Sequence, residues 1–277
     1  MRLKPDRSLP EGIPTDAPAL FAGVRPHLPF GLMGRHFLAV REIGSTNTVA
    51  LALAALDAPE GSVVVADYQT AGRGRQGRAW LAPPDTALLV SILLRPTGPA
   101  ERIPQLSLVA GVAVREALAL AGVETRLKWP NDILLHGKKV CGILLEAASG
   151  PLREPGVVVG IGLNVNQERA DFAADLRQRA TSLSVATGRA WERETLLMLL
   201  LSSMDRWYST HRREGFAPVR EAWLSGSGDL GRWIRVDSRG AGRMVDLGAD
   251  GALIVETARG GRIEILAGEI EAHAPRR

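Results

Sequence analysis

The chain is short of cysteine and of long apolar segments. Its 277 residues include a single cysteine, Cys141, which excludes an internal disulfide and a cysteine-rich metal site. No apolar run approaches the ~18 residues that span a bilayer. Residues 1–20 contain four prolines and no apolar segment of the kind found in signal peptides. These absences predict a cytoplasmic protein with no membrane contact.

Lysine and aromatic residues are also scarce. Arginine and lysine together number 34 against 30 acidic residues, for a net charge of +4, yet only four of the basic residues are lysines. Three of these lysines fall within residues 128–139. A small positive charge is compatible with an anionic ligand, with nucleic acid, or with neither. The position of the lysines is therefore more informative than the net charge.

The remaining composition is that of a globular protein, with 45% hydrophobic and 23% charged residues. The 30 glycines show no three-residue period, which excludes a collagen-like fold. Apolar spacing predicts helices and strands in alternation, and hence an α+β fold. Helices are expected at 47–56, with Ser45 or Thr46 as N-cap, at 103–121, within 165–187 and at 191–208. Strands are expected at 62–67, 87–94, 125–129, 133–135, 140–147 and 156–163.

The last fifty residues differ from the rest of the chain in the length and spacing of their apolar segments. After a Ser/Gly cluster at 225–228, short apolar segments recur at 233–236, 244–247, 253–256 and 263–266, separated by glycine turns. This pattern predicts a small antiparallel barrel. We therefore divide the chain into a Pro-rich extended lead-in (1–33), a larger α+β domain (34–225) and a barrel domain (226–277).

The most distinctive segment is 68–80, which directly follows an expected strand. Three glycines alternate there with three arginines (Arg73, Arg75 and Arg78). Glycine allows close backbone approach to an anion, and the arginine fork matches phosphate or carboxylate. The segment lacks the Gly-Lys-Ser/Thr ending of a P-loop and the Rossmann spacing. Its composition alone leaves three readings open: an anion-binding loop, a short RNA-binding element, or a solvated basic loop.

A second segment, 128–142, contains the lysines. Pro130 disfavours helix for the residue before it, so Asn131 and Asp132 are expected at a turn between strands. Such a pair often satisfies only backbone groups, although Asp132 is also suited to hold Mg²⁺ beside phosphates. Lys139 opens a strand after a tight hairpin, which is expected to direct its ammonium along the sheet face, where it can follow developing charge on an oxygen.

A third segment, 160–166, ends an apolar strand with two glycines and two asparagines. Small residues at a strand end allow a flat ring to approach the backbone, and Asn164 offers both a donor and an acceptor. A glycine-rich strand end is more often simply a turn. This segment alone is weak evidence for a binding site.

Together, and in this order, five segments resemble the motifs of the biotin–protein ligases. They are Gly-Ser-Thr-Asn at 44–47, the Arg/Gly segment 68–80, Lys-Trp-Pro-Asn-Asp at 128–132, residues 138–146 and Gly-Ile-Gly-Leu-Asn at 160–164. The resemblance covers residues 40–170 and implies a central mixed sheet packed with helices, similar to class II synthetases. The barrel would then be SH3-like. RNA binding becomes the weaker interpretation, because an aromatic stacking platform is missing at 5% aromatic residues.

The resemblance implies a ligase that forms a carbon–nitrogen bond. Such enzymes join biotin to ATP as biotinyl-5′-AMP, then transfer the biotinyl group to a lysine of a biotin carboxyl carrier domain of acetyl-CoA carboxylase. Lys139 and Arg75 would be catalytic, and Asp132 would hold Mg²⁺. By the same resemblance, the biotin site would comprise Ser45, Thr46, Asn47, Gln69, Gly72, Arg73, Gly74, Arg75, Lys139 and Gly142. The ATP site would comprise Arg73, Arg75, Arg78, Trp80, Asn131, Asp132, Gly160 and Asn164.

One family feature is not expected here. Some members carry an N-terminal helix-turn-helix domain and act as repressors, but the residues before Gly34 are too few and too rich in proline to form one. We therefore expect no DNA binding, whereas a homodimer is compatible with the sequence. A lipoate–protein ligase, which uses related adenylate chemistry, is the nearest alternative, and the Arg/Gly segment argues against it.

Overall fold

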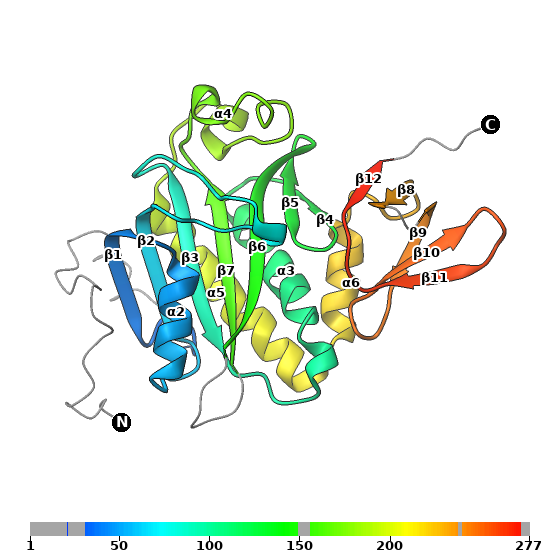
Figure 1. Cartoon of the computed structure of the whole chain (residues 1–277), viewed down its shortest axis with the longest axis horizontal. Helices are drawn as coiled ribbons and strands as arrows, with labels where there is room; N and C mark the ends of the chain where they lie inside the picture. Colours follow the sequence, from blue (N-terminus) through cyan, green and yellow to red (C-terminus); the bar gives the residue numbers. More distant parts are fainter. Residues whose placement is uncertain (1–20, 22–30, 149–155, 238–239, 273–277) are drawn as a thin grey trace.

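A seven-stranded mixed sheet forms the centre of the chain in a computed structural model (Figure 1). The structure describes residue 21 and residues 31–148, 156–237 and 240–272. The strand order is β1-β2-β3-β7-β6-β5-β4, with β1 and β2 parallel and the other neighbours antiparallel. The strands are β1 (Phe37–Ile43), β2 (Val63–Gln69), β3 (Ala87–Leu94), β4 (Arg126–Lys128), β5 (Asp132–Leu135), β6 (Lys138–Ala148) and β7 (Gly156–Asn164). The predicted α+β class with a central mixed sheet is confirmed.

Helices cover both faces of this sheet, because alternate side chains of its strands point to opposite sides. On β2, Val63 and Val65 join the large core, whereas Val64 joins a smaller cluster on the other face. Helices α3 (Gln105–Leu120) and α5 (Arg193–Glu214) pack on the side of the large core, and α2 (Thr46–Ala55) covers part of the opposite face (Figure 1). The part that α2 leaves uncovered is available for a binding site.

The predicted helices are largely confirmed. Ser45 precedes α2 as its N-cap residue, although its side chain makes no capping hydrogen bond. The expected helix over 191–208 begins later, at Arg193, and runs to Glu214. Within 165–187 the helix is the short α4 (Leu183–Thr187). The sequence patterns did not predict helix α6 (Ala217–Gly226), nor strand β1 of the large sheet.

Helix α3 is the one described helix that is long and apolar enough to cross a membrane, counted from Ala100 to Leu120. Within the fold, 61% of that apolar window is buried. Its residues Leu106, Val109 and Val112 belong to the large core. The apolar character of α3 is thus accounted for by its place between the sheet and α5.

A second, five-stranded antiparallel sheet follows α6, in the order β11-β10-β9-β8-β12. Its strands are β8 (Trp233–Val236), β9 (Ala241–Leu247), β10 (Leu253–Thr257), β11 (Arg262–Ile265) and β12 (Ile270–Ala272). Four of these were predicted and β12 was not. The sheet fits the predicted small barrel, while the SH3-like form and the domain boundaries at 34 and 226 stay predictions. The lead-in predicted over 1–33 falls outside the described residues, apart from Phe21 and residues 31–33.

The second sheet is attached to the first by specific contacts. The indole Nε1 of Trp129 donates to the carbonyl of Gly251 at 3.2 Å, and Gln105 Nε2 donates to the carbonyl of Ala249 at 2.6 Å. Apolar residues of both sheets also belong to one continuous buried cluster. The five-stranded sheet therefore stands at a fixed place beside the seven-stranded sheet.

Candidate functional site

The uncovered face of the large sheet has a floor of small residues. Ser91 of β3 lies opposite Gly160 of β7, and one step along the sheet Gly162 lies opposite Gly142 of β6. The strand period of two places these four residues on the face that α2 partly covers. Because the three glycines lack a Cβ, the side chains of Asn47 and Trp80 lie directly against their backbone.

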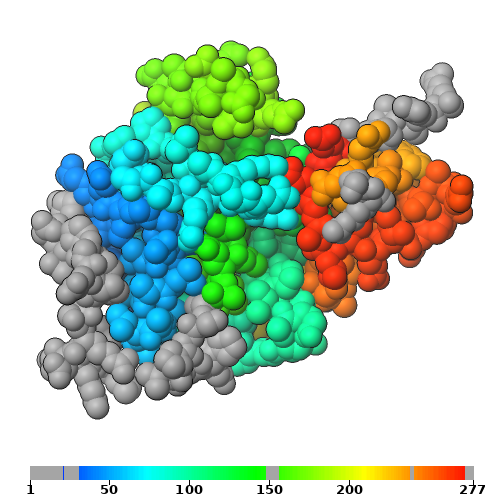
Figure 2. All heavy atoms as spheres, in the orientation of Figure 1, coloured from blue at the N-terminus to red at the C-terminus, as the bar shows by residue number. Residues whose placement is uncertain are grey.

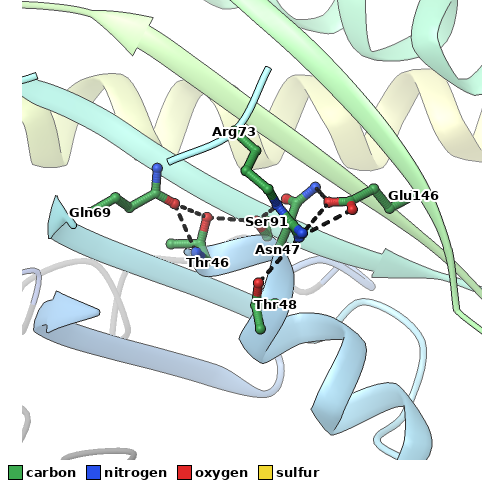
Figure 3. Close-up of polar contacts among 7 residues, drawn as sticks. All are labelled: Thr46, Asn47, Thr48, Gln69, Arg73, Ser91 and Glu146. Atoms are coloured by element: carbon green, nitrogen blue, oxygen red, sulfur yellow. Dashed lines mark hydrogen bonds and ion pairs between the residues drawn. The ribbon is translucent and has the colours of Figure 1, made fainter. Parts of the chain in front are cut away.

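A chain of buried polar side chains lines one end of this floor (Figure 3). Gln69 Oε1 accepts from both the backbone N–H and the hydroxyl of Thr46, at 2.7 and 2.9 Å. Ser91 is fully buried, and its hydroxyl lies 2.7 Å from the Thr46 hydroxyl. Because its carbonyl is used in this way, the Gln69 amide turns its Nε2 donor towards Gly72. These hydrogen bonds hold the side chains of Thr46, Gln69 and Ser91 in one arrangement.

Asn47 extends the same network towards β6. Its Nδ2 donates to Glu146 Oε2 at 2.7 Å, and its Oδ1 accepts from the Ser91 hydroxyl (Figure 3). Arg73 reaches the same carboxylate, 3.1 Å from Oε1, and also donates to the Thr48 hydroxyl at 3.2 Å. Predicted site residues from two segments, 45–47 and 68–80, are therefore brought together by Glu146.

The Arg/Gly segment lies across the site and is held at three points by its arginines. Arg73 is anchored to Glu146, Arg75 donates to Asn131 Oδ1 at 2.9 Å, and Arg78 pairs with Glu269 of the barrel at 2.6 Å. Figure 2 shows this segment, in cyan, reaching the red atoms of the barrel. All three acceptors are oxygens, and two are carboxylates. Such contacts are of the kind that an anionic ligand can replace.

A β-bulge places Lys139 on the site face. Ile133 of β5 is paired with Cys141 and Leu134 with Lys139, so Val140 is an extra residue in β6. Both Val140 and Cys141 belong to the large core. Without the extra residue, strict alternation would direct Lys139 into the core with Cys141, because bulges re-aim side chains in this way. The predicted direction of the Lys139 ammonium, along the sheet face, is confirmed.

The Lys139 ammonium lies close to the glycine floor. Its Nζ is 2.6 Å from Asp132 Oδ1 and 5.8 Å from the centre of the Trp80 ring. The Trp80 ring covers Gly142 and Gly162, since a Cβ on either residue would lie within 3.0 Å of ring atoms. The buried Trp80 Nε1 has no hydrogen-bond partner among the described residues. An unpaired buried donor is costly, so this group is suited to a ligand atom.

Two asparagines of the predicted ATP site have their amide groups paired within the chain. Asn131 lies in the turn before β5, where its Nδ2 donates to the carbonyl of Ile143 at 2.7 Å and its Oδ1 accepts from Arg75. Asn164 uses both ends of its amide within the chain, because it donates to the Thr181 carbonyl and accepts from Gln167. Its position is thus structural in this arrangement, and its predicted part in ATP binding stays a prediction.

Cys141 is a core residue, as predicted. It is fully buried beneath the site, and burial raises the pKa of its thiol above the ordinary value, an effect that the nearby Lys139 opposes. The thiolate form is therefore disfavoured. Cys141 takes no part in the chemistry above the sheet.

Sequence reasoning missed Ser91 and Glu146 as site residues. Ser91 is the one polar residue in an eight-residue strand of apolar side chains, a signal that was present in the sequence. Glu146 stands in one of the five motifs, but its partners are 99 and 73 residues away along the chain. Only the strand order reveals that Asn47 and Arg73 converge on it.

Gly160 offers a direct test of the packing at this floor. A Cβ at residue 160 would lie 2.2 Å from Asn47 Oδ1, so Gly160→Ala must displace the Asn47 side chain. We expect the free energy of unfolding to fall by about 1–3 kcal/mol, as for other overpacked sites. Urea denaturation measures this loss. Gly44→Ala is the control, because a Cβ there meets nothing within 4 Å; equal stability of the two variants would contradict the placement of Asn47.

The sequence of this chain is similar to those of known proteins. Residues 39–166 match the model of the biotin/lipoate A/B protein ligase family. The bifunctional ligase/repressor BirA of Bacillus spizizenii is 39% identical over 241 residues, which cover 86% of this chain and 74% of that protein. The biotin–[acetyl-CoA-carboxylase] ligase of Paracoccus denitrificans is 43% identical over 198 residues, 69% of this chain and 80% of that protein.

A solved structure is similar over nearly the whole fold. The biotin protein ligase from Aquifex aeolicus, in complex with biotin and ATP, has a TM-score of 0.74 and 32% sequence identity. The match covers 87% of this chain and 100% of that chain. The similarity therefore includes the second sheet as well as the catalytic one.

Proposed function

Since the chain belongs to the biotin/lipoate A/B protein ligase family, we propose that its site couples biotin to ATP and then to a protein lysine. The chain is a biotin–protein ligase, an enzyme that forms a carbon–nitrogen bond. One observation carries the mechanism. The buried polar side chains around Thr46 and the Arg/Gly segment lie next to each other on the glycine-lined face of the large sheet, and the Lys139 ammonium lies on the same face.

The polar pocket is suited to the ureido ring of biotin. That ring carries one carbonyl acceptor and two N–H donors, and a site built for such groups rejects a molecule that lacks them. Ser45, Thr46, Asn47 and Gln69 are buried around the pocket and supply donors and acceptors. Gly72, Gly74 and Gly142 allow the bicyclic ring and its chain to lie against backbone.

The Arg/Gly segment is suited to the reacting end. The biotin carboxylate must attack the α-phosphorus of ATP, and two unit charges of like sign at 4 Å repel by ~4 kcal/mol at an effective dielectric of 20. Arg73, Arg75, Arg78 and Lys139 are the cations of this region, and they would offset that repulsion. A new bond then joins the carboxylate oxygen to phosphorus as the bond to pyrophosphate breaks, giving biotinyl-5′-AMP.

The nucleotide would extend from Lys139 towards the turn before β5. Asn131 and Asp132 lie at this turn, and Gly160, Asn164 and the ring of Trp80 are the further residues that we propose contact the nucleotide. The segment 72–78 would then cover the adenylate and exclude water, because a mixed anhydride hydrolyses readily.

The residues present fit a substrate-bound Mg²⁺ rather than a closed metal site. Mg²⁺ is commonly held by one or two carboxylates together with substrate phosphates. Asp132 supplies such a carboxylate beside Lys139, and the described residues contain no group of three or more metal-ligating side chains. A bound Mg²⁺ would neutralise phosphate charge, and Asp132 is the residue that would hold it.

In the second step the ε-amino group of the acceptor lysine attacks the acyl carbonyl. An amide bond forms, the bond to AMP breaks and the amine loses a proton. We propose a biotin carboxyl carrier domain of acetyl-CoA carboxylase as the acceptor, in keeping with the relative from Paracoccus denitrificans. Cytoplasmic location, compatibility with a homodimer and the lack of a DNA or membrane partner are further parts of this proposal.

The activity is tested by biotin-dependent exchange of labelled pyrophosphate into ATP. We expect exchange with biotin and at most ~1% of that rate with lipoate, because lipoate lacks the ureido carbonyl and N–H groups that these polar side chains are proposed to recognise. Equal or faster exchange with lipoate would favour a lipoate ligase. Retention of RNA on filters with no exchange would favour an RNA-binding protein instead.

A further inference from the structure

We propose that Glu146 is a positioning residue that couples the biotin pocket to the Arg/Gly segment. Its carboxylate is shared by Asn47 of α2, at 2.7 Å, and by Arg73, at 3.1 Å (Figure 3). Thr46 with Gln69, and Thr48 with Arg73, link the same two elements, but Glu146 is the side chain that contacts both Asn47 and Arg73. The inference deepens the proposed function and rests on it, since it assigns Glu146 a part in the same reaction.

The first role of Glu146 is to fix the orientation of the Asn47 amide. An ionised carboxylate only accepts hydrogen bonds, so the NH₂ end of Asn47 must face it. The Asn47 carbonyl is then directed at the Ser91 hydroxyl and at Gly160. If the amide turned over, its carbonyl would face the carboxylate and its NH₂ would lose that acceptor. Glu146 thereby decides which atom of Asn47 is offered on the pocket side.

The second role is to hold Arg73 over the site. The guanidinium of Arg73 contacts Glu146 and Thr48, which keeps the start of the segment beside the pocket. The Arg73 side chain is 47% exposed, so solvent screens this contact and its loss loosens the segment only moderately. The Glu146 side chain therefore links the orientation of Asn47 to the position of Arg73 and its segment.

Two substitutions separate the roles. Glu146→Gln keeps an acceptor for Asn47 but loses the charge that holds Arg73, whereas Glu146→Ala loses both. We expect biotin affinity, measured by calorimetry, to stay within about threefold of wild type in Glu146→Gln and to fall about tenfold in Glu146→Ala. Trypsin cleavage after Arg73, Arg75 or Arg78 should become about three to ten times faster in both variants.

Thermal unfolding confirms that each variant is folded, and Glu264→Gln, on the exposed side of the barrel, is the matched control. Wild-type affinity and cleavage rates in both variants would overturn the proposal. So would an equal loss of affinity in both, because charge rather than acceptor geometry would then be responsible. Pyrophosphate exchange by the wild type is measured in parallel. Its absence rejects the proposed function, whereas normal exchange with unaltered variants rejects only the role of Glu146.

Discussion

Replacing Lys139 by alanine should slow biotin-dependent pyrophosphate exchange by about 100- to 1,000-fold, the usual effect of removing one group that stabilises transition-state charge. Biotin affinity should change by no more than about threefold, because the proposed role of the Lys139 ammonium is to stabilise the charge that develops in the reaction rather than to bind the ureido ring. Exchange kinetics and calorimetry measure the two quantities separately. The prediction follows from the place of Nζ beside Asp132 and over the glycine floor.

Lys138→Ala provides the control for this variant. Lys138 is adjacent in sequence, but its ammonium lies near the carbonyl of Arg177 at 3.4 Å, away from the floor. The fold should tolerate Lys139→Ala, because the backbone N–H and carbonyl of Lys139 are held by Arg179 and Thr181. An exchange rate equal to that of wild type would remove Lys139 from the chemistry.

Replacing Arg75 by glycine should release biotinyl-5′-AMP from the enzyme. Arg75 is the middle anchor of the segment, through its bond to Asn131, and a hydrogen bond from a charged group contributes about 1.5–3 kcal/mol. Its loss should speed escape of the intermediate about 10- to 100-fold. The free anhydride then acylates exposed lysines. Incubation with an unrelated protein should show biotin on many of its lysines by mass spectrometry.

Gln76→Gly is the control within the same segment. Gln76 has a φ of +57°, a conformation that glycine adopts without strain, and its substitution removes one contact of Arg78 but keeps the Arg75–Asn131 anchor. We expect labelling to remain confined to the natural acceptor domain. Indiscriminate labelling by Gln76→Gly, or none by Arg75→Gly, would contradict the role assigned to the Arg75 anchor.

Much of the fold was predictable because its strands are compact and β-branched. The apolar segments at 62–67, 87–94 and 156–163 have the strand signature of a buried sheet. Strand β1 was missed because its half-exposed sequence includes Arg41 and Glu42 among apolar residues. Its place in the sheet is decided by pairing with β2, which lies beyond an intervening helix.

The site was predictable as motifs but not as an arrangement. Spacing and composition identified the Arg/Gly segment and Lys139, because glycine and basic residues have local consequences. The bulge at Val140, which turns Lys139 out of the core, depends on pairing with β5 and leaves no local signal. The role of Glu146 also has no local signal in the sequence, since it follows from the strand order that brings Asn47 and Arg73 to this side chain.

The most direct test is a crystal structure of the chain with biotin and a non-hydrolysable ATP analogue. We predict the ureido ring between Thr46 and Gln69, with the carboxylate and the α-phosphate both in contact with Lys139 Nζ beneath residues 72–78. Ligands bound elsewhere, or a carboxylate and phosphate held apart from the arginines, would contradict the claim that this charged segment drives their reaction.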